Sequence, residues 1–122
     1  IDGFKGINDC KGHAYGDQVL QEVADALKDA ASGKGFCYRY GGDEFVLILS
    51  VDDPEEAEEV KKKLSDRLRT QDIYVSIGIS YPEFGKIRSD LEQNRLRDRL
   101  ETYIQKADHE MYCYKRLHHT AR

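Results

Sequence analysis

One short pattern near the middle of the chain restricts the folds open to it more than any other. Residues 36–40 and 43–49 are rich in aromatic and β-branched side chains, which favour β-strands, and the pair Gly41-Gly42 separates them. A Gly-Gly pair is typical of a type I′ hairpin turn, because both central residues of that turn need a positive φ. We therefore expect an antiparallel hairpin whose second strand begins with two adjacent carboxylates, Asp43 and Glu44.

Apolar residues recur at helical spacing before and after this hairpin. The stripe over residues 17–30 predicts one helix, and the stripe from Asp98 onward predicts a last one. Aliphatic residues occupy every second position of 73–79, which is the pattern of a strand. The polar segment 81–97 is assigned no regular element, although Ser89-Asp90 favours the start of a separate helical turn.

A further helix is predicted directly after Asp53. This residue can act as an N-cap, Pro54 occupies the first helical position, and Glu56 lies three residues beyond the cap. The resulting order is helix, hairpin, helix, strand, helix, and it predicts an α/β sandwich in which helices cover a sheet. A length of 122 residues suits a single domain.

The composition argues against several classes of function. The net charge of −4 does not suit a broad nucleic-acid-binding surface, and no apolar run approaches the ~20 residues of a membrane-spanning helix. Three cysteines, Cys10, Cys37 and Cys113, fit neither a disulfide framework nor a metal knuckle, which indicates a reducing, cytoplasmic setting. If the protein binds phosphates, we expect it to do so locally and through a metal ion.

Asp43 and Glu44 are the first candidate site. Carboxylates at a tight turn are well placed to hold Mg²⁺, which takes a few hard oxygen ligands and shares phosphate oxygens with a substrate. Adjacent side chains on a strand point to opposite faces, so the two carboxylates cannot have the same role. The alternative is a solvated turn that is acidic without being a site, since turns are commonly acidic.

A second candidate site lies near the N-terminus, around His13. Asn8 offers an amide that donates and accepts, Asp17 only accepts, and Gly12 and Gly16 allow a ligand to approach the backbone closely. A carboxylate that accepts from the N1–H and 2-amino groups of a purine selects guanine over adenine. The alternative makes Asp17 a helix cap and Asn8 a turn residue.

Two further features suit a phosphate ligand. Main-chain N–H groups in Phe4-Lys5-Gly6-Ile7 can cradle phosphates, as helix starts and nests do. Lys115, near the C-terminus, can supply a distant positive charge, although a single lysine is usually only a solvated one.

Together these residues resemble the GGDEF domain of the diguanylate cyclase family. The matching positions run in order over nearly the whole chain: 2–9, Gly12-His13, Gly16-Asp17, 39–45, 76–79, Ala107-Asp108, Tyr112 and Lys115. Each piece is common by itself, whereas this many pieces in register are very specific. The resemblance implies the nucleotidyl cyclase fold, an α/β sandwich with a central, mainly antiparallel sheet flanked by helices.

The resemblance also implies roles for the candidate residues. Asp43 would bind Mg²⁺ and help to deprotonate the attacking hydroxyl, and Glu44 would assist at the metal or at the 3′-hydroxyl. The backbone carbonyl of Ile1 is implied as a further metal ligand, and Mn²⁺ can substitute for Mg²⁺. The other residues are implied to bind GTP: Asn8, Asp17 and His13 at the guanine, and Phe4, Lys5, Gly41, Gly42 and Lys115 at the triphosphate.

The implied reaction joins two GTP molecules into cyclic di-GMP and releases two pyrophosphates. Each protomer of a homodimer holds one GTP, and the 3′-hydroxyl of one nucleotide attacks the α-phosphate of the other. Such a domain works in the cytoplasm, where GTP is. It commonly follows an N-terminal sensory domain in a parent protein that can itself be membrane-anchored.

The sequence departs from the family pattern at its start. The family's first motif is Asp-x-Asp-x-Phe-Lys, and here the chain begins at Ile1, so the first Asp and the strand that carries it are absent. We therefore expect residues 1–122 to be one GGDEF domain that is incomplete at the N-terminus. The same departure motivates an alternative function: a degenerate, non-catalytic GGDEF module that binds GTP and regulates a partner domain.

Overall fold

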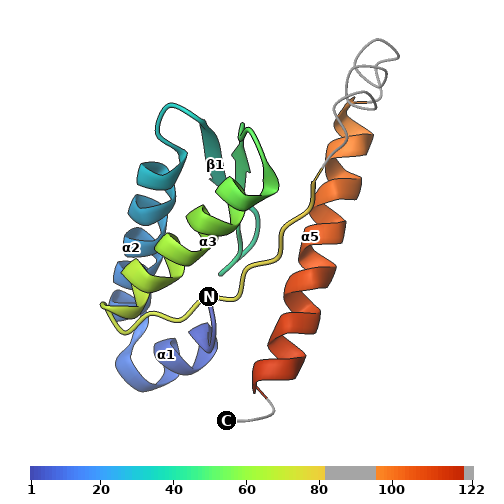
Figure 1. The fold of residues 1–122 in the computed structure, drawn as a ribbon. Helices are drawn as coiled ribbons and strands as arrows, with labels where there is room; N and C mark the ends of the chain where they lie inside the picture. The colour runs from blue at the N-terminus through green and yellow to red at the C-terminus, as the bar shows by residue number, and fades with distance from the viewer. Residues whose placement is uncertain (82–95, 120–122) are drawn as a thin grey trace. The chain divides into compact units, whose positions relative to one another are not determined.

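The computed structural model describes residues 1–81 and 96–119 (Figure 1). The chain consists of two compact units. The first unit is Ile1–Val75, and the second begins at Ser76. The elements are α1 (Phe4–Lys11), α2 (His13–Ala31), β1 (Gly35–Arg39), β2 (Phe45–Leu49) and α3 (Pro54–Arg69) in the first unit and α5 (Leu96–His119) in the second. The helical turn predicted at Ser89-Asp90 lies outside the described residues. In the described part of the chain, every helix is too short or too polar to cross a membrane.

β1 and β2 form the predicted antiparallel hairpin. The register runs from Gly35 opposite Leu49 to Arg39 opposite Phe45, so residues 40–44 form the turn. The two predicted strands are therefore confirmed in type, whereas the predicted start of the second strand at Asp43 is wrong, because β2 begins at Phe45. The aromatic and β-branched residues on either side of Gly41-Gly42 were sufficient to place them approximately, because that composition favours strands.

The predicted type I′ turn is wrong, because five residues rather than two separate the paired strands. Neither Gly41 nor Gly42 has a positive φ. The Glu44 carbonyl closes the loop instead, by accepting hydrogen bonds from the N–H groups of Tyr40 at 2.9 Å and Gly41 at 3.2 Å. Asp43 and Glu44 consequently lie in the turn, so the pleat of a strand does not set the directions of their side chains.

α2 contains the predicted helix 17–30 but begins earlier, at His13. Its buried residues Val19, Val23 and Leu27 are spaced by four positions and form one apolar stripe. The periodicity identified this stripe correctly. It could not locate the start of the helix, because the first turn of α2 lies outside the stripe.

Gly12 separates α2 from α1. Its φ of 88° lies in the region that favours glycine, and its N–H group ends α1 by donating to the Asn8 carbonyl at 2.9 Å. Hydrophobic periodicity does not predict α1, which has no buried residue and therefore no apolar stripe.

α3 begins as predicted, with Asp53 as its N-cap and Pro54 in the first turn. Asp53 Oδ1 accepts from Glu56 N at 2.9 Å, and Glu56 Oε2 accepts from Asp52 N at 3.1 Å, one residue before the cap. Glu56 Oε1 also accepts from Lys34 Nζ at 2.8 Å. This hydrogen bond lowers the pKa of the Glu56 carboxyl and raises the pKa of Lys34. The start of α3 is thereby linked to the residue that precedes β1.

The core of the first unit forms where α2 packs against both α3 and the hairpin (Figure 1). Leu68 in α3 is completely buried, at 0% exposure. The chain that follows α3 is held close to it, because Ile73 N donates to the Leu68 carbonyl at 2.9 Å. At the surface, Arg67 of α3 pairs with Asp29 of α2 at 2.7 Å.

The strand predicted over 73–79 is wrong, because the described residues contain no strand there. Alternation shows which side chains share a face, whereas a strand also needs a neighbouring backbone that bonds it along its length. The described residues combine helices with a small two-stranded antiparallel sheet, which confirms an α/β class. A central sheet flanked by helices stays a prediction.

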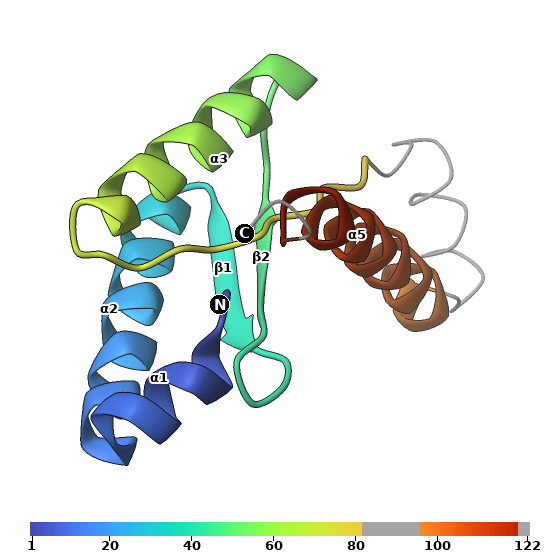
Figure 2. The ribbon, with the colours of Figure 1, turned by 90° about the horizontal axis from the view of Figure 1, so that it is seen from below.

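The N-terminal residues lie between the hairpin turn and the segment that follows α3. The amino group of Ile1 donates to the Asp43 carbonyl at 3.0 Å, and Asp2 N donates to the Tyr74 carbonyl at 2.8 Å. Figure 2 shows the N-terminus close to the turn end of the hairpin and to the start of α1. These two hydrogen bonds bring the start of α1 to the turn.

In the second unit, the chain after Ser76 approaches α5 closely. Ser80 Oγ donates to the Tyr103 carbonyl at 2.7 Å. A Cβ atom at Gly78 would overlap the carbonyl oxygen of Ala107, so glycine permits this approach and larger residues do not.

Replacing Asp53 with alanine is expected to lower the free energy of unfolding by about 1 kcal/mol, because Glu56 N loses its acceptor at the start of α3. Asp52→Ala is the matched control, since Asp52 contributes its backbone N–H rather than a side-chain cap. Urea unfolding followed by circular dichroism measures both variants. Equal losses in the two would contradict the capping role of Asp53.

Candidate functional site

The turn between β1 and β2 gathers the residues predicted to bind a metal ion. Asp43 and Glu44 are both half-buried there. The hydrogen bond from the Ile1 amino group to the Asp43 carbonyl, 3.0 Å long, places Ile1 directly beside them. Two carboxylates and the backbone of Ile1 therefore share one corner of the first unit.

These groups fit a magnesium ion whose coordination a substrate completes. Mg²⁺ is usually bound by one or two carboxylates together with phosphate oxygens rather than by a cage of protein ligands. The described ranges contain no group of three or more His, Cys, Asp or Glu side chains that could hold a metal ion. The remaining oxygen ligands of an ion at this turn would therefore come from phosphates and water.

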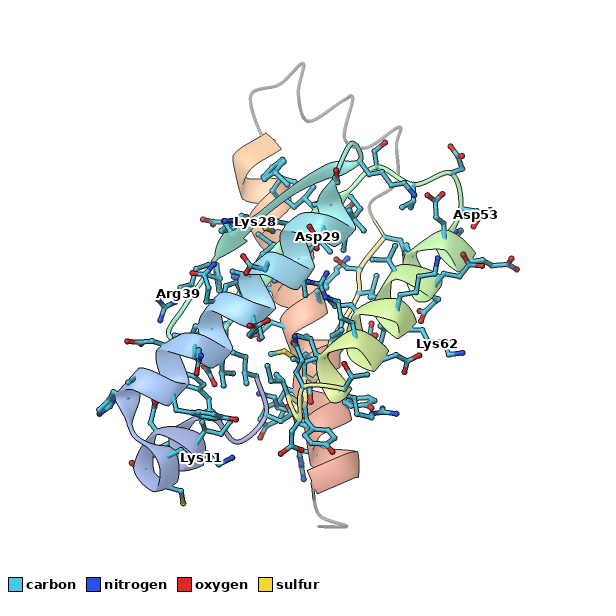
Figure 3. All side chains as sticks on the ribbon, turned by 90° about the vertical axis from the view of Figure 1, so that its left-hand side faces the viewer. Lys11, Lys28, Asp29, Arg39, Asp53 and Lys62 are labelled. Carbon is cyan, nitrogen blue, oxygen red and sulfur yellow. The ribbon has the colours of Figure 1, made fainter. Side chains whose placement is uncertain are left out.

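Arg39 also bonds to this turn, although the sequence did not predict it as a site residue. Its Nε donates to the carbonyls of Gly41 at 3.1 Å and Gly42 at 3.0 Å, and its Nη2 donates to the Gly42 carbonyl at 2.6 Å. Figure 3 shows Arg39 on the hairpin, where the ribbon of β1 ends. An arginine two residues before a Gly-Gly pair is the sequence signal that could have found it, because a guanidinium offers several donors to exposed turn carbonyls.

The start of α1, where Phe4 and Lys5 are predicted to bind phosphate, leaves its first backbone N–H groups without an acceptor inside the helix. Its N-cap is Gly3, which supplies no side-chain acceptor. The hydrogen bond from Ile7 N to the Gly3 carbonyl, at 3.0 Å, closes the first turn. The N–H groups of Phe4, Lys5 and Gly6 precede that bond, and such groups at a helix start favour anions. Phe4 is half-buried and Lys5 is exposed.

Asn8 carries a buried acceptor without a partner among the described residues. Its Oδ1 is shielded from solvent and makes no hydrogen bond. This oxygen lies against Gly16, where an added Cβ atom would overlap it. An unsatisfied buried acceptor costs about 1–3 kcal/mol. A ligand that donated to Asn8 Oδ1 would remove that cost once the side chain turned out of its contact with Gly16.

The alternative roles considered for Asp17 and Asn8 are wrong. The N-cap of α2 is Gly12, so Asp17 lies inside the helix rather than at its cap. Asn8 lies inside α1 and not in a turn. The contact between Asn8 and Gly16 places Asp17, the next residue along the chain, at the same corner of the two helices. His13 is the exposed first residue of α2.

Lys115 is half-buried on α5, in the second unit. The other candidates all belong to the first unit. The predicted contact between Lys115 and the same nucleotide therefore stays a prediction.

Almost the entire chain matches a single protein family. The family model described as "Diguanylate cyclase, GGDEF domain" matches residues 1–120. The chain therefore belongs to the GGDEF family of diguanylate cyclase domains, and the resemblance seen in the sequence is confirmed.

Several relatives have names that include this activity. The chain is 37% identical over 103 residues to the bifunctional diguanylate cyclase/cyclic di-GMP phosphodiesterase MucR of Pseudomonas aeruginosa. The aligned region covers 77% of this chain and 15% of MucR. The chain is 31% identical over 124 residues to the diguanylate cyclase DosC of Escherichia coli, and the aligned region covers 95% of this chain and 25% of DosC. It is 33% identical over 121 residues to diguanylate cyclase A of Treponema denticola, with 92% and 30% covered. The chain thus spans less than a third of each of these relatives. No solved structure matches it.

Replacing Gly16 with alanine is expected to lower the free energy of unfolding by about 1–3 kcal/mol, because the new Cβ overlaps Asn8 Oδ1 and forces α1 away from α2. Gly6→Ala is the matched control: nothing lies within 4 Å of its Cβ position, and alanine is the better residue inside a helix. Urea unfolding compares the two variants. If Gly16→Ala were as stable as Gly6→Ala, the two helices would not pack as closely as described.

Proposed function

We propose that residues 1–122 form the catalytic domain of a diguanylate cyclase, which condenses two GTP molecules into cyclic di-GMP and releases two pyrophosphates. The family match over residues 1–120 supports the class of reaction. The observation that carries the proposal is the meeting of Ile1, Asp43 and Glu44 at the hairpin turn. The resemblance to the family implies that residues of this turn act on the phosphates.

The base of GTP binds at the corner between α1 and α2. The side-chain amide of Asn8 contacts the guanine, and its unpaired Oδ1 turns out of the contact with Gly16 to accept a hydrogen bond. The exposed carboxylate of Asp17 accepts from N1–H and the 2-amino group, a pair of donors that adenine lacks. His13 lies beside this base, on the first turn of α2.

The triphosphate binds to backbone groups near the start of the chain. The N–H groups of Phe4 and Lys5 donate to phosphate oxygens at the uncapped start of α1. Gly41 and Gly42 are exposed in the turn and let the nucleotide approach its backbone. Lys115 adds a positive charge to the same phosphates. A backbone site of this kind suits a chain whose net charge is −4.

The chemical step forms a bond between the 3′-oxygen of one GTP and the α-phosphorus of the other. The bond from that phosphorus to pyrophosphate breaks, and pyrophosphate leaves with the electron pair. Asp43 takes the proton of the attacking hydroxyl, and Glu44 assists at the 3′-hydroxyl. Two such steps close the ring. Holding both nucleotides in the reacting orientation supplies up to ~7–11 kcal/mol of the lowering of the barrier.

Asp43, Glu44 and the carbonyl of Ile1 are the residues that would hold Mg²⁺, for which Mn²⁺ can substitute. When bound, the ion polarises the phosphoryl oxygens and screens the charge of the leaving group.

The reaction needs two protomers, since each holds one GTP. The chain spans less than a third of the three relatives named above, and we propose that the parent protein carries an N-terminal sensory domain that controls how two catalytic domains meet. The domain works in the cytoplasm, whether or not the parent is anchored to a membrane. Nucleic acid is not a partner.

The proposal is tested by incubating the protein with GTP and Mg²⁺ and separating the products by chromatography. We expect cyclic di-GMP, formed at a rate that rises more steeply than linearly with protein concentration because two protomers act together. Asp43→Asn removes the charge of one carboxylate at constant shape and is expected to lower the rate at least about 100-fold. Asp29→Asn is the matched control, since that carboxylate is 71% exposed on α2 and pairs with Arg67.

Two results would count against the proposal. GTP binding without product at high protein concentration would favour the regulatory module that binds GTP without turning it over. An unchanged rate in Asp43→Asn would show that the turn is not the catalytic site.

A further inference from the structure

Arg39 holds two carbonyls of the hairpin turn on one side. Its Nε lies 3.1 Å from the Gly41 oxygen and 3.0 Å from the Gly42 oxygen, and its Nη2 lies 2.6 Å from the Gly42 oxygen. One guanidinium thus makes three donor–acceptor contacts with the turn. These contacts hold the Gly-Gly turn in a conformation that differs from the usual one with positive φ angles. Neither glycine has a positive φ here.

The planarity of the peptide bond determines how the next N–H groups are directed. In a trans peptide the C=O and N–H groups point in opposite directions, and the described chain contains no cis peptide bond. The carbonyls of Gly41 and Gly42 face Arg39. The N–H groups of Gly42 and Asp43 belong to the same two peptide units, so they face away from it.

These two N–H groups are available to a ligand. Among the described residues, neither donates a hydrogen bond, whereas the N–H groups of Tyr40 and Gly41 both bond to the Glu44 carbonyl. The surroundings of Gly42 are open, because a Cβ atom added there would meet nothing within 4 Å. Successive free N–H groups that face one side of a turn attract anions.

We propose that Arg39 is a positioning residue, whose guanidinium directs the N–H groups of Gly42 and Asp43 toward a phosphate group of the nucleotide. This inference rests on the proposed function for the identity of the ligand, GTP. The guanidinium itself stays on the other side of the turn. By occupying the two carbonyl oxygens, it also keeps their negative ends away from the phosphate.

Lysine cannot take over this role. Nε and Nη2 of Arg39 act together in a rigid fork that contacts two carbonyls, whereas a lysine ammonium is a point charge at the end of a flexible chain. Arg39→Lys therefore keeps the positive charge and loses the paired hydrogen bonds to the two carbonyls. Arg67→Lys is the matched control, because Arg67 makes an exposed ion pair between α3 and α2.

The test is an NMR titration of the ¹⁵N-labelled chain with inorganic pyrophosphate, with GTP and with guanosine. In the wild type and in Arg67→Lys, the amide signals of Gly42 and Asp43 are expected to shift with pyrophosphate and GTP but not with guanosine. In Arg39→Lys, the midpoints are expected to move to roughly tenfold higher concentration or more. Signals from α3 report whether the variant is folded, and guanidinium ion added to Arg39→Ala at sub-denaturing concentration is expected to restore part of the binding.

Steady-state rates separate positioning from a purely structural role. We expect Arg39→Lys to raise the KM for GTP more than it lowers kcat, at an unchanged unfolding midpoint. If both amides stay unshifted by pyrophosphate and GTP in the wild type, or shift at the same concentration in Arg39→Lys, the inference is overturned. If the amides shift as expected but no cyclic di-GMP forms, the proposed function fails and the phosphate-binding turn stands.

Discussion

Two hydrogen bonds at the beginning of the chain hold the candidate site together. Ile1 donates to the carbonyl of Asp43 in the hairpin turn, and Asp2 donates to the carbonyl of Tyr74 after α3. Two neighbouring residues therefore join two different segments, the hairpin turn and the chain after α3. The carboxylates of the turn and the free N–H groups at the start of α1 thus share one corner, although about forty residues separate them in the chain.

The corner between α1 and α2 depends on two glycines for two different physical reasons. Gly12 is needed for its backbone conformation, since a φ of 88° is strained for residues with a side chain. Gly16 is needed for space, since the Asn8 amide occupies the position of its missing Cβ. The first sets where one helix ends and the next begins, and the second sets how closely they pack. Together they place Asn8 and Asp17 on adjacent surfaces.

Features that are encoded locally could be predicted from the sequence. The strands of the hairpin and the start of α3 at Asp53 are examples, because each depends on residues within a few positions of one another. The hairpin turn could not be predicted in the same way, since Gly-Gly permits several turns and the side chain of Arg39 helps to select one of them. The segment 73–79 shows a similar limit: alternation indicates a face but does not supply a neighbouring strand.

The same distinction applies to the candidate site. The family resemblance pointed to Asn8, Asp43 and the start of α1, but it did not reveal that Asn8 Oδ1 is buried without a partner. It also did not reveal that Arg39 bonds to the turn. Both facts depend on contacts between side chains and backbone that no spacing rule describes.

The conformation of the hairpin turn also bears on why glycine occupies positions 41 and 42. Gly41 and Gly42 have φ values that other residues can adopt, and a methyl group at either position meets at most an ordinary contact, 3.7 Å from the Glu44 side chain. Alanine is therefore compatible with the free protein at both positions. If glycine were nevertheless required there, the reason would be the space that the bound nucleotide occupies. A stability assay paired with a binding assay would separate this steric effect of the ligand from any effect on folding.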